Sequence, residues 1–207
     1  MFDRPAERLY PIIDADVSRA GGIDPLALAL ACFRGGALVL QVRVKGGSSA
    51  SFLELAAAIV DAARPFRAAV IVNDRADIAL MSGAAGVHVG QEDIPPDDLR
   101  RVFAGTIGLS THDETQAARA LASSANYIAV GPIFGTATKE TGYTARGLGL
   151  LSHAARGGKP VVAIGGITLD RAPEVIAAGA ASVAVITDLL TGGDPEQRVR
   201  TFLRALE

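Results

Sequence analysis

Three polar residues alternate with apolar ones shortly after residue 40. Gln41, Arg43 and Lys45 are separated by Val42 and Val44, and residues two apart in an extended strand point to the same side. An amide and two cations on one side could hold an anion. Surface charges at a solvated strand end would give the same pattern, so this run alone leaves both interpretations open.

Carboxylates follow the next two apolar runs of the sequence. Asn73 and Asp74 come after one run, and Asp93 comes after the other. Mg²⁺ is typically bound by one or two carboxylates together with phosphate oxygens and water. Asp74 with Asp93 therefore suggests a metal beside the cations, although an Asp after a strand also serves as a helix cap or an ion-pair partner.

A second group of residues could hold another anion. The loop from Gly131 to Lys139 carries the hydroxyls of Thr136 and Thr138 and the Lys139 cation among small neighbours, which allow close approach to an anion. Two further turns, Gly165-Gly166 and Ile186-Thr187, can donate backbone N–H groups. We expect a phosphate site there.

Other reaction classes lack support in the sequence. None of the three histidines has metal-ligand spacing: His153 is expected on a helix surface, His88 within a strand, and His112 after Ser110. The sequence contains no Ser-His-Asp arrangement, no setting for a nucleophilic cysteine and no Gly-x-Gly-x-x-Gly fingerprint after a strand. Acyl transfer and dinucleotide redox chemistry are therefore set aside.

The composition limits the partners and the location. The 207 residues are 49% hydrophobic with a formal net charge of −2, so no overall basic field is available for nucleic acid or an acidic membrane surface. No apolar run is long enough for a signal peptide or a membrane span. The single cysteine, Cys32, cannot form an internal disulfide. We expect a cytoplasmic protein, while the sequence does not decide whether it forms a homo-oligomer.

These polar residues must be positioned by a parallel sheet. Val- and Ile-rich runs alternate with Ala- and Leu-rich stretches, which is typical of repeated βα units. Eight runs predict strands: Leu9 to Ile13, Ala37 to Val42, Ala68 to Val72, Gly86 to Val89, Thr106 to Leu109, Tyr127 to Val130, Pro160 to Ile164 and Ser182 to Ile186.

Eight βα units in a chain of this length favour an α/β fold of the (β/α)8 TIM barrel type over an open sheet, with residues 1–207 as one domain. Helices are expected over Ser51 to Ala63, Asp113 to Ala122, Leu169 to Ala178 and Pro195 to Leu206, with Asp24, Thr168 and Asp194 as N-caps. The catalytic groups of such barrels lie at the carboxyl ends of the strands.

The segments at these strand ends resemble those of thiamine-phosphate synthases. The resemblance is carried by residues 41–45, 73–75, 86–93, 110–112 and 136–139, in this order and spacing, and it spans nearly the whole chain. It implies an enzyme that joins a pyrimidine diphosphate to a thiazole phosphate and releases diphosphate. Small-molecule substrates and Mg²⁺ are the expected partners.

The resemblance also implies a role for individual residues. Catalytic roles would fall to Arg43, Lys45, Lys139 and Ser110, and Asp74 and Asp93 would bind Mg²⁺. The pyrimidine diphosphate would be held by Gln41, Arg43, Lys45, Asn73, Ser110 and Lys139, and the thiazole phosphate by Thr136, Thr138, Gly166, Ile186 and Thr187. By hypothesis the cations and the metal stabilise the departing diphosphate, and the thiazole nitrogen captures the pyrimidine methylene cation without a general base.

Two rival functions remain to be weighed. The thiazole tautomerase branch resembles the synthases in fold but typically carries a His where Pro132 stands here, and an isomerase has no diphosphate leaving group to neutralise. A noncatalytic phosphate-binding barrel would need the anion contacts without the carboxylate pair. Pro132 and the retained Asp74, Asp93 and Lys139 favour the synthase.

Overall fold

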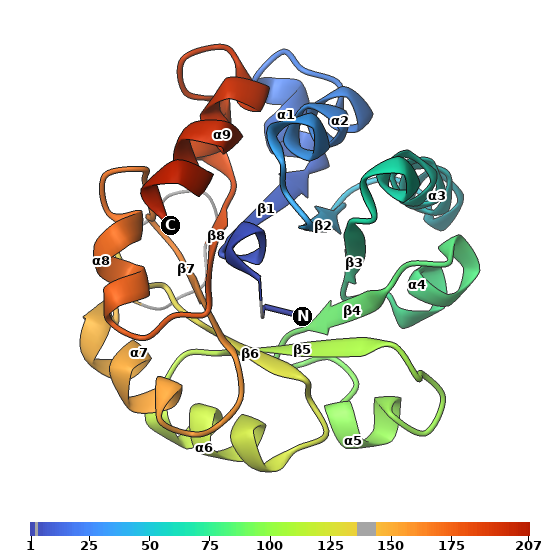
Figure 1. Ribbon diagram of the computed structural model, residues 1–207. Coiled ribbons are helices and arrows are strands. Elements are labelled where there is room, and N and C mark those ends of the chain that lie inside the picture. The colour runs from blue at the N-terminus through green and yellow to red at the C-terminus, as the bar shows by residue number, and fades with distance from the viewer. Residues whose placement is uncertain (3, 136–143) are drawn as a thin grey trace.

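The computed structural model describes residues 1–2, 4–135 and 144–207 and contains a closed barrel of parallel strands (Figure 1). Neighbouring strands pair in chain order, and β8 pairs with β1 to close the barrel. The strands are β1 Leu9–Asp14, β2 Val39–Arg43, β3 Ala69–Asn73, β4 Gly86–Val89, β5 Thr106–Thr111, β6 Tyr127–Val130, β7 Val161–Ile164 and β8 Ser182–Val185. The TIM barrel predicted from the sequence is confirmed, and no predicted strand end differs from the structure by more than two residues.

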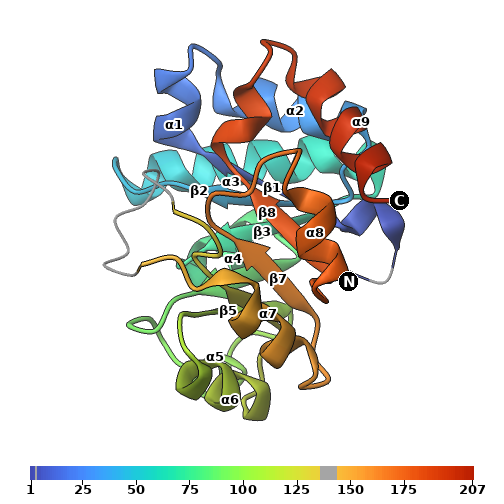
Figure 2. The ribbon, with the colours of Figure 1, turned by 90° about the vertical axis from the view of Figure 1, so that its left-hand side faces the viewer.

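Helices surround this barrel on the outside (Figures 1 and 2). They are α1 Ala15–Ala20, α2 Pro25–Gly35, α3 Ser49–Ala63, α4 Ala76–Ser82, α5 Pro96–Leu99, α6 Glu114–Ala122, α7 Gly147–Ala155, α8 Ala172–Ala177 and α9 Pro195–Ala205, with 3-10 turns η1 Pro5–Glu7, η2 Arg64–Phe66 and η3 Thr187–Leu190. None of the helices in the described ranges is long and apolar enough to cross a membrane.

Side-chain oxygens cap several of these helices. Asp24 accepts hydrogen bonds from the first turn of α2, and Asp194 does so for α9, as predicted. Asp113 caps α6 in the same way. These caps fix where the helices begin and hence where the preceding loops end.

The strands have two apolar faces, as expected for a parallel sheet covered by helices. Outward side chains such as Leu9, Ile13 and Val87 belong to the large core between barrel and helices. Inward side chains such as Tyr10 and Val39 form a smaller cluster inside the barrel. The single cysteine, Cys32 of α2, is free and fully buried in the outer core.

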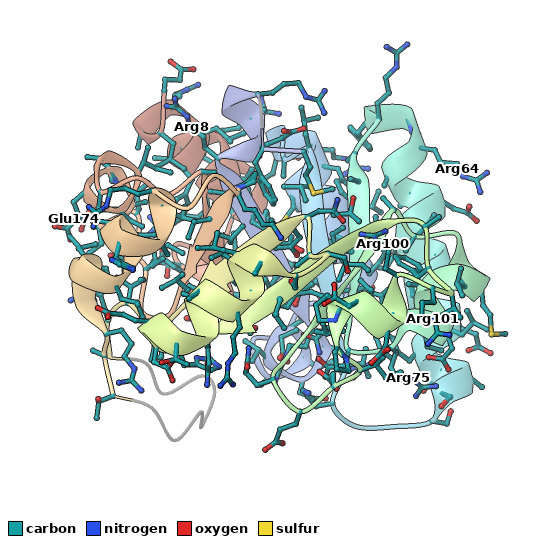
Figure 3. The ribbon with its side chains drawn as sticks, turned by 90° about the horizontal axis from the view of Figure 1, so that it is seen from below. Arg8, Arg64, Arg75, Arg100, Arg101 and Glu174 are labelled. Carbon is teal, nitrogen blue, oxygen red and sulfur yellow. The ribbon has the colours of Figure 1, made fainter. Side chains whose placement is uncertain are left out.

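The N-terminal segment lies across one end of the barrel in Figure 1. The Phe2 ring packs against Tyr10 and Tyr127 inside the barrel, with centroid distances of 5.9 and 5.1 Å. In Figure 3, Arg8 just before β1 and Arg75 just after β3 lie toward opposite edges of the molecule. Apolar packing thus fills the barrel at the amino ends of the strands, whereas the loops that follow the strands surround the opposite end.

Candidate active site

A cavity of about 470 Å³ lies at the carboxyl ends of the strands. Its walls come from loops and strand ends around the barrel, which is where this fold places active sites. Several of the residues predicted from the sequence line it together: Gln41, Arg43, Asn73, Ser110, Gly166, Ile186 and Thr187. The structure therefore brings residues that are up to about 150 positions apart in the chain into one space.

Arg43 is held in this cavity by a carboxylate that the sequence reasoning did not identify. Asp14 ends β1 directly opposite Arg43 at the end of β2, and its Oδ2 accepts a hydrogen bond from Arg43 Nη1. Its Oδ1 accepts from the backbone N–H groups of Asp16 and Val17, each at 3.1 Å, which caps α1. The side chains of Arg43 and Asp14 are only 14% and 4% exposed. Asp14 therefore fixes the position of the cation.

Lys45 and Asp74 pair at the rim rather than within the cavity lining. Lys45 Nζ lies 2.6 Å from Asp74 Oδ2, and the two side chains are 47% and 28% exposed. Ion pairs this exposed contribute about 0–1 kcal/mol, so an anionic ligand could replace Asp74 as the partner of Lys45 with little loss of free energy. Asp74 has a left-handed backbone with φ of 62°, and its N–H donates to the His88 carbonyl at 2.7 Å. This bond holds Asp74 against β4.

Asp93 follows β4, the strand that neighbours β3. Its Oδ2 accepts a hydrogen bond of 2.7 Å from the Gly90 N–H. No group of three or more His, Cys, Asp or Glu that could hold a metal is found within the described ranges. Asp74 and Asp93 follow the adjacent strands β3 and β4, and both offer only oxygen atoms as ligands. Such a pair fits Mg²⁺, which takes its remaining ligands from substrate oxygens and water.

The turn after β7 packs closely on the loop after β6. Gly165 and Gly166 have φ angles of 100° and 64°. A Cβ on Gly166 would lie 2.5 Å from the Gly135 carbonyl oxygen and 2.9 Å from Phe134 Cβ. Only glycine satisfies both the backbone conformation and this contact. The loop that leads to residues 136–139 is therefore pressed against the predicted phosphate turn.

The expected cap of the helix after β7 was wrong. Thr168 was predicted to cap a helix beginning at Leu169, but α8 begins at Ala172 and its N-cap position is Arg171, with no side-chain cap. The Leu169 N–H donates instead to Asp188 Oδ2 at 3.1 Å. A carboxylate from the turn after β8 thus satisfies the N–H group, and the chain makes a turn before the helix starts.

Three of the predicted residues, Thr136, Thr138 and Lys139, lie outside the described residues. The cavity is also lined by residues that were not predicted as site residues: Tyr10, His88, His112, Arg171 and Asp188. Arg171 Nη1 donates to the Gly166 carbonyl at 3.0 Å, and its guanidinium lies 4.6 Å from the Phe134 ring centroid. The sequence held one indication of this role, because Arg171 stands only five residues after the predicted phosphate residue Gly166.

Comparisons with known proteins agree on one family. A family model described as thiamine monophosphate synthase matches residues 9–189. The chain is 43% identical over 190 residues to the thiamine-phosphate synthase of Anaeromyxobacter dehalogenans, covering 90% of this chain and 85% of that protein. It is 42% identical over 207 residues to that of Koribacter versatilis, covering 96% and 95%. A solved thiamine phosphate pyrophosphorylase from Pyrococcus furiosus superposes with a TM-score of 0.87 at 26% identity, covering 98% of this chain and 96% of that one.

Proposed function

The chain belongs to the thiamine-phosphate synthase family and is an enzyme of thiamine biosynthesis, and we propose that its cavity binds a pyrimidine diphosphate and a thiazole phosphate together. The observation that carries this proposal is the convergence of Gln41, Arg43, Asn73 and Ser110 with the Gly166 turn in one space. Amides, a hydroxyl and a cation are suited to the first substrate, and a glycine turn is suited to the phosphate of the second.

The diphosphate would lie over the ends of β2 to β5. Arg43 is already oriented by Asp14, so little side-chain entropy is lost when it binds an oxygen of the leaving group. Lys45 would exchange Asp74 for the diphosphate, and Lys139 would add a third cation. Gln41, Asn73 and Ser110 would supply neutral hydrogen bonds from the cavity wall.

The thiazole phosphate would lie over the ends of β6 to β8. Gly166, Ile186 and Thr187 line this side of the cavity, and backbone N–H groups in such turns commonly hold phosphate in barrels. Thr136 and Thr138 would complete the site from the loop that packs on Gly166. The two anions would then lie on opposite sides of the cavity, with the pyrimidine and thiazole rings between them.

Asp74 and Asp93 are the residues that would hold Mg²⁺. When bound, a divalent cation neutralises charge on the diphosphate oxygens. The reaction itself breaks the bond between the pyrimidine methylene carbon and the diphosphate oxygen, and the bonding electron pair leaves with the diphosphate. The thiazole nitrogen then forms the new bond with its lone pair, so no side chain needs to remove a proton. The role of Arg43, Lys45 and Lys139 is electrostatic.

A cytoplasmic location and a single domain over residues 1–207 belong to the same proposal. The free thiol of Cys32 supports a reducing compartment.

The test is to mix the purified protein with both phosphorylated heterocycles and Mg²⁺ and to follow diphosphate and thiamine phosphate together. We expect equal amounts of the two products and loss of both when Mg²⁺ is chelated. Absence of diphosphate release would refute the synthase activity and indicate a noncatalytic phosphate-binding barrel. Turnover of the thiazole phosphate alone would indicate an isomerase.

A carboxylate variant tests the metal residues. Asp74→Ala should lower turnover about 100-fold and raise the Mg²⁺ concentration needed for half-maximal rate. The matched control is Asp61→Ala, which removes an exposed carboxylate of α3 paired with Arg64 and should leave turnover unchanged. Native turnover of the Asp74 variant at limiting Mg²⁺ would refute the metal role.

A further inference from the structure

A hydrogen-bonded row of largely buried polar side chains crosses the inside of the barrel at the floor of the cavity. Gln41 Nε2 donates to the Tyr10 hydroxyl at 3.2 Å, and that hydroxyl lies 3.0 Å from the Tyr127 hydroxyl. The Tyr127 hydroxyl lies 2.9 Å from His88 Nδ1, and His88 Nε2 lies 2.8 Å from Ser110 Oγ. The first four side chains are at most 7% exposed. This row of side chains therefore links β2 to β5 through β1, β6 and β4.

The direction of hydrogen donation along this row follows from its first member. Because the Gln41 amide nitrogen can only donate, the Tyr10 hydroxyl accepts there and has one hydrogen left for Tyr127. Tyr127 in turn donates its hydrogen to His88. If Tyr127 donated to Tyr10 instead, the Tyr10 hydroxyl would accept two hydrogen bonds, and its own hydrogen would have no acceptor among these five side chains. Burial raises the pKa of both tyrosines, so both keep these hydrogens at neutral pH.

This order sets the protonation of the imidazole. A histidine whose Nδ1 accepts a hydrogen bond carries its proton on Nε2 when neutral. That proton is then donated to Ser110 Oγ, and the hydroxyl hydrogen of Ser110 is free to point elsewhere. Ser110 and His88 both line the cavity, so an anion there would meet a hydroxyl hydrogen rather than a lone pair.

Gly108 of β5 leaves room for Tyr127 and His88, the central pair of this row, because it has no side chain. A Cβ on Gly108 of β5 would lie 2.1 Å from Tyr127 Cζ and 2.5 Å from His88 Nδ1. The two rings stack over this glycine with centroids 5.5 Å apart. Glycine weakens a strand interior, so its presence here shows that the close approach of Tyr127 and His88 requires it.

We propose that His88 is a positioning residue, held by Tyr127 as the neutral Nε2–H tautomer so that the Ser110 hydroxyl donates its hydrogen into the cavity. The tautomer is a property of the protein without ligand. The consequence for an anion rests on the proposed function, in which Ser110 contacts the diphosphate.

The tautomer can be read directly from the nitrogen-15 chemical shifts of labelled histidine. The chain has only three histidines, and His153, exposed on α7, serves as an internal reference. We expect His88 with Nε2 protonated and Nδ1 unprotonated at neutral pH. In Tyr127→Phe the Nδ1 shift should move and both tautomers should be populated, whereas Ser110→Ala should leave the Nδ1 shift nearly unchanged. A protonated Nδ1 in the unaltered protein would overturn the proposal. The spectrum of the unaltered protein therefore tests the tautomer even if Tyr127→Phe does not fold.

The effect on the site is tested with inorganic diphosphate and Mg²⁺ by calorimetry. Ser110→Ala and Tyr127→Phe should each weaken binding about 10-fold or more, the value of one hydrogen bond to a charged group. The double variant should bind no more weakly than Ser110→Ala, because Tyr127 acts through Ser110. Losses that multiply would overturn the coupling. Failure of the unaltered protein to bind diphosphate would instead overturn the proposed ligand, and the spectrum would still decide the tautomer.

Discussion

Removing the Asp14 carboxylate should be one of the most damaging single changes near the site. Asp14→Ala deletes a helix cap, worth about 1 kcal/mol, and leaves the guanidinium of Arg43 without its partner. Breaking a buried pair in this way costs about 3–5 kcal/mol. Arg43 borders the cavity and is 14% exposed, so water can reach it and the lower end applies. We expect a total of about 4 kcal/mol.

Two matched variants separate these contributions in urea unfolding. Asp24→Ala removes a similar cap, which accepts hydrogen bonds from Leu26 and Ala27 at 3.0 Å on an exposed surface, and should cost about 1 kcal/mol. Asp14→Asn keeps the oxygen that caps α1 but loses the charge, and should cost about 3 kcal/mol. If Asp14→Ala destabilised the protein no more than Asp24→Ala, the Asp14–Arg43 ion pair would contribute nothing to the free energy of unfolding, and the reasoning would be refuted.

Three further predictions concern other parts of the molecule. Burial raises the pKa of Cys32 to about 12, so a thiol reagent at pH 8 should label it only after unfolding in urea; rapid labelling of the native protein would contradict this. The Arg75 side-chain hydrogen bond lowers the pKa of Asp77 to about 2. The pair therefore stabilises the folded protein above the pKa that Asp77 has in the unfolded chain, and this stabilisation is lost as the pH falls through about 2. On this exposed pair it amounts to about a few tenths of a kcal/mol. Arg75→Ala should return the NMR titration midpoint of Asp77 toward its ordinary value of about 3.9, and an unmoved midpoint would refute the assignment. Gly108→Ala places a methyl group 2.1 Å from Tyr127 Cζ and should destabilise the protein by about 1–3 kcal/mol; an unchanged melting temperature would exclude that contact.

The strands could be predicted from sequence because their signal is local. Each strand is a short Val- and Ile-rich run with two buried faces, and all eight runs are strands in the structure. The side to which Gln41 and Arg43 point followed from the period of two alone, and both face the cavity.

The partners of these residues could not be predicted in the same way. Asp14 pairs with Arg43 across a strand register that appears only when β1 and β2 align. Thr168 is not the predicted helix cap, because Asp188, twenty positions later, accepts the hydrogen bond from the Leu169 N–H group. His88 looked like an ordinary strand residue, since its hydrogen bonds come from β5 and β6. In each case the deciding contact is made between elements that are distant in sequence.

The polarity of the barrel interior changes along its axis, and this gradient bears on the strength of the site. Along β2 the inward residues run from Val39 through Gln41 to Arg43, and along β3 from Ile71 to Asn73. Because all the strands are parallel, every such gradient ends at the same rim. The apolar end is packed by Phe2 against the tyrosines, so the cations of the rim lie above a closely packed interior of low dielectric. A charge beside a region of low dielectric acts on its ligand more strongly than one surrounded by water. The apolar halves of β2 and β3 thus strengthen the electrostatic interactions of the polar residues at their ends.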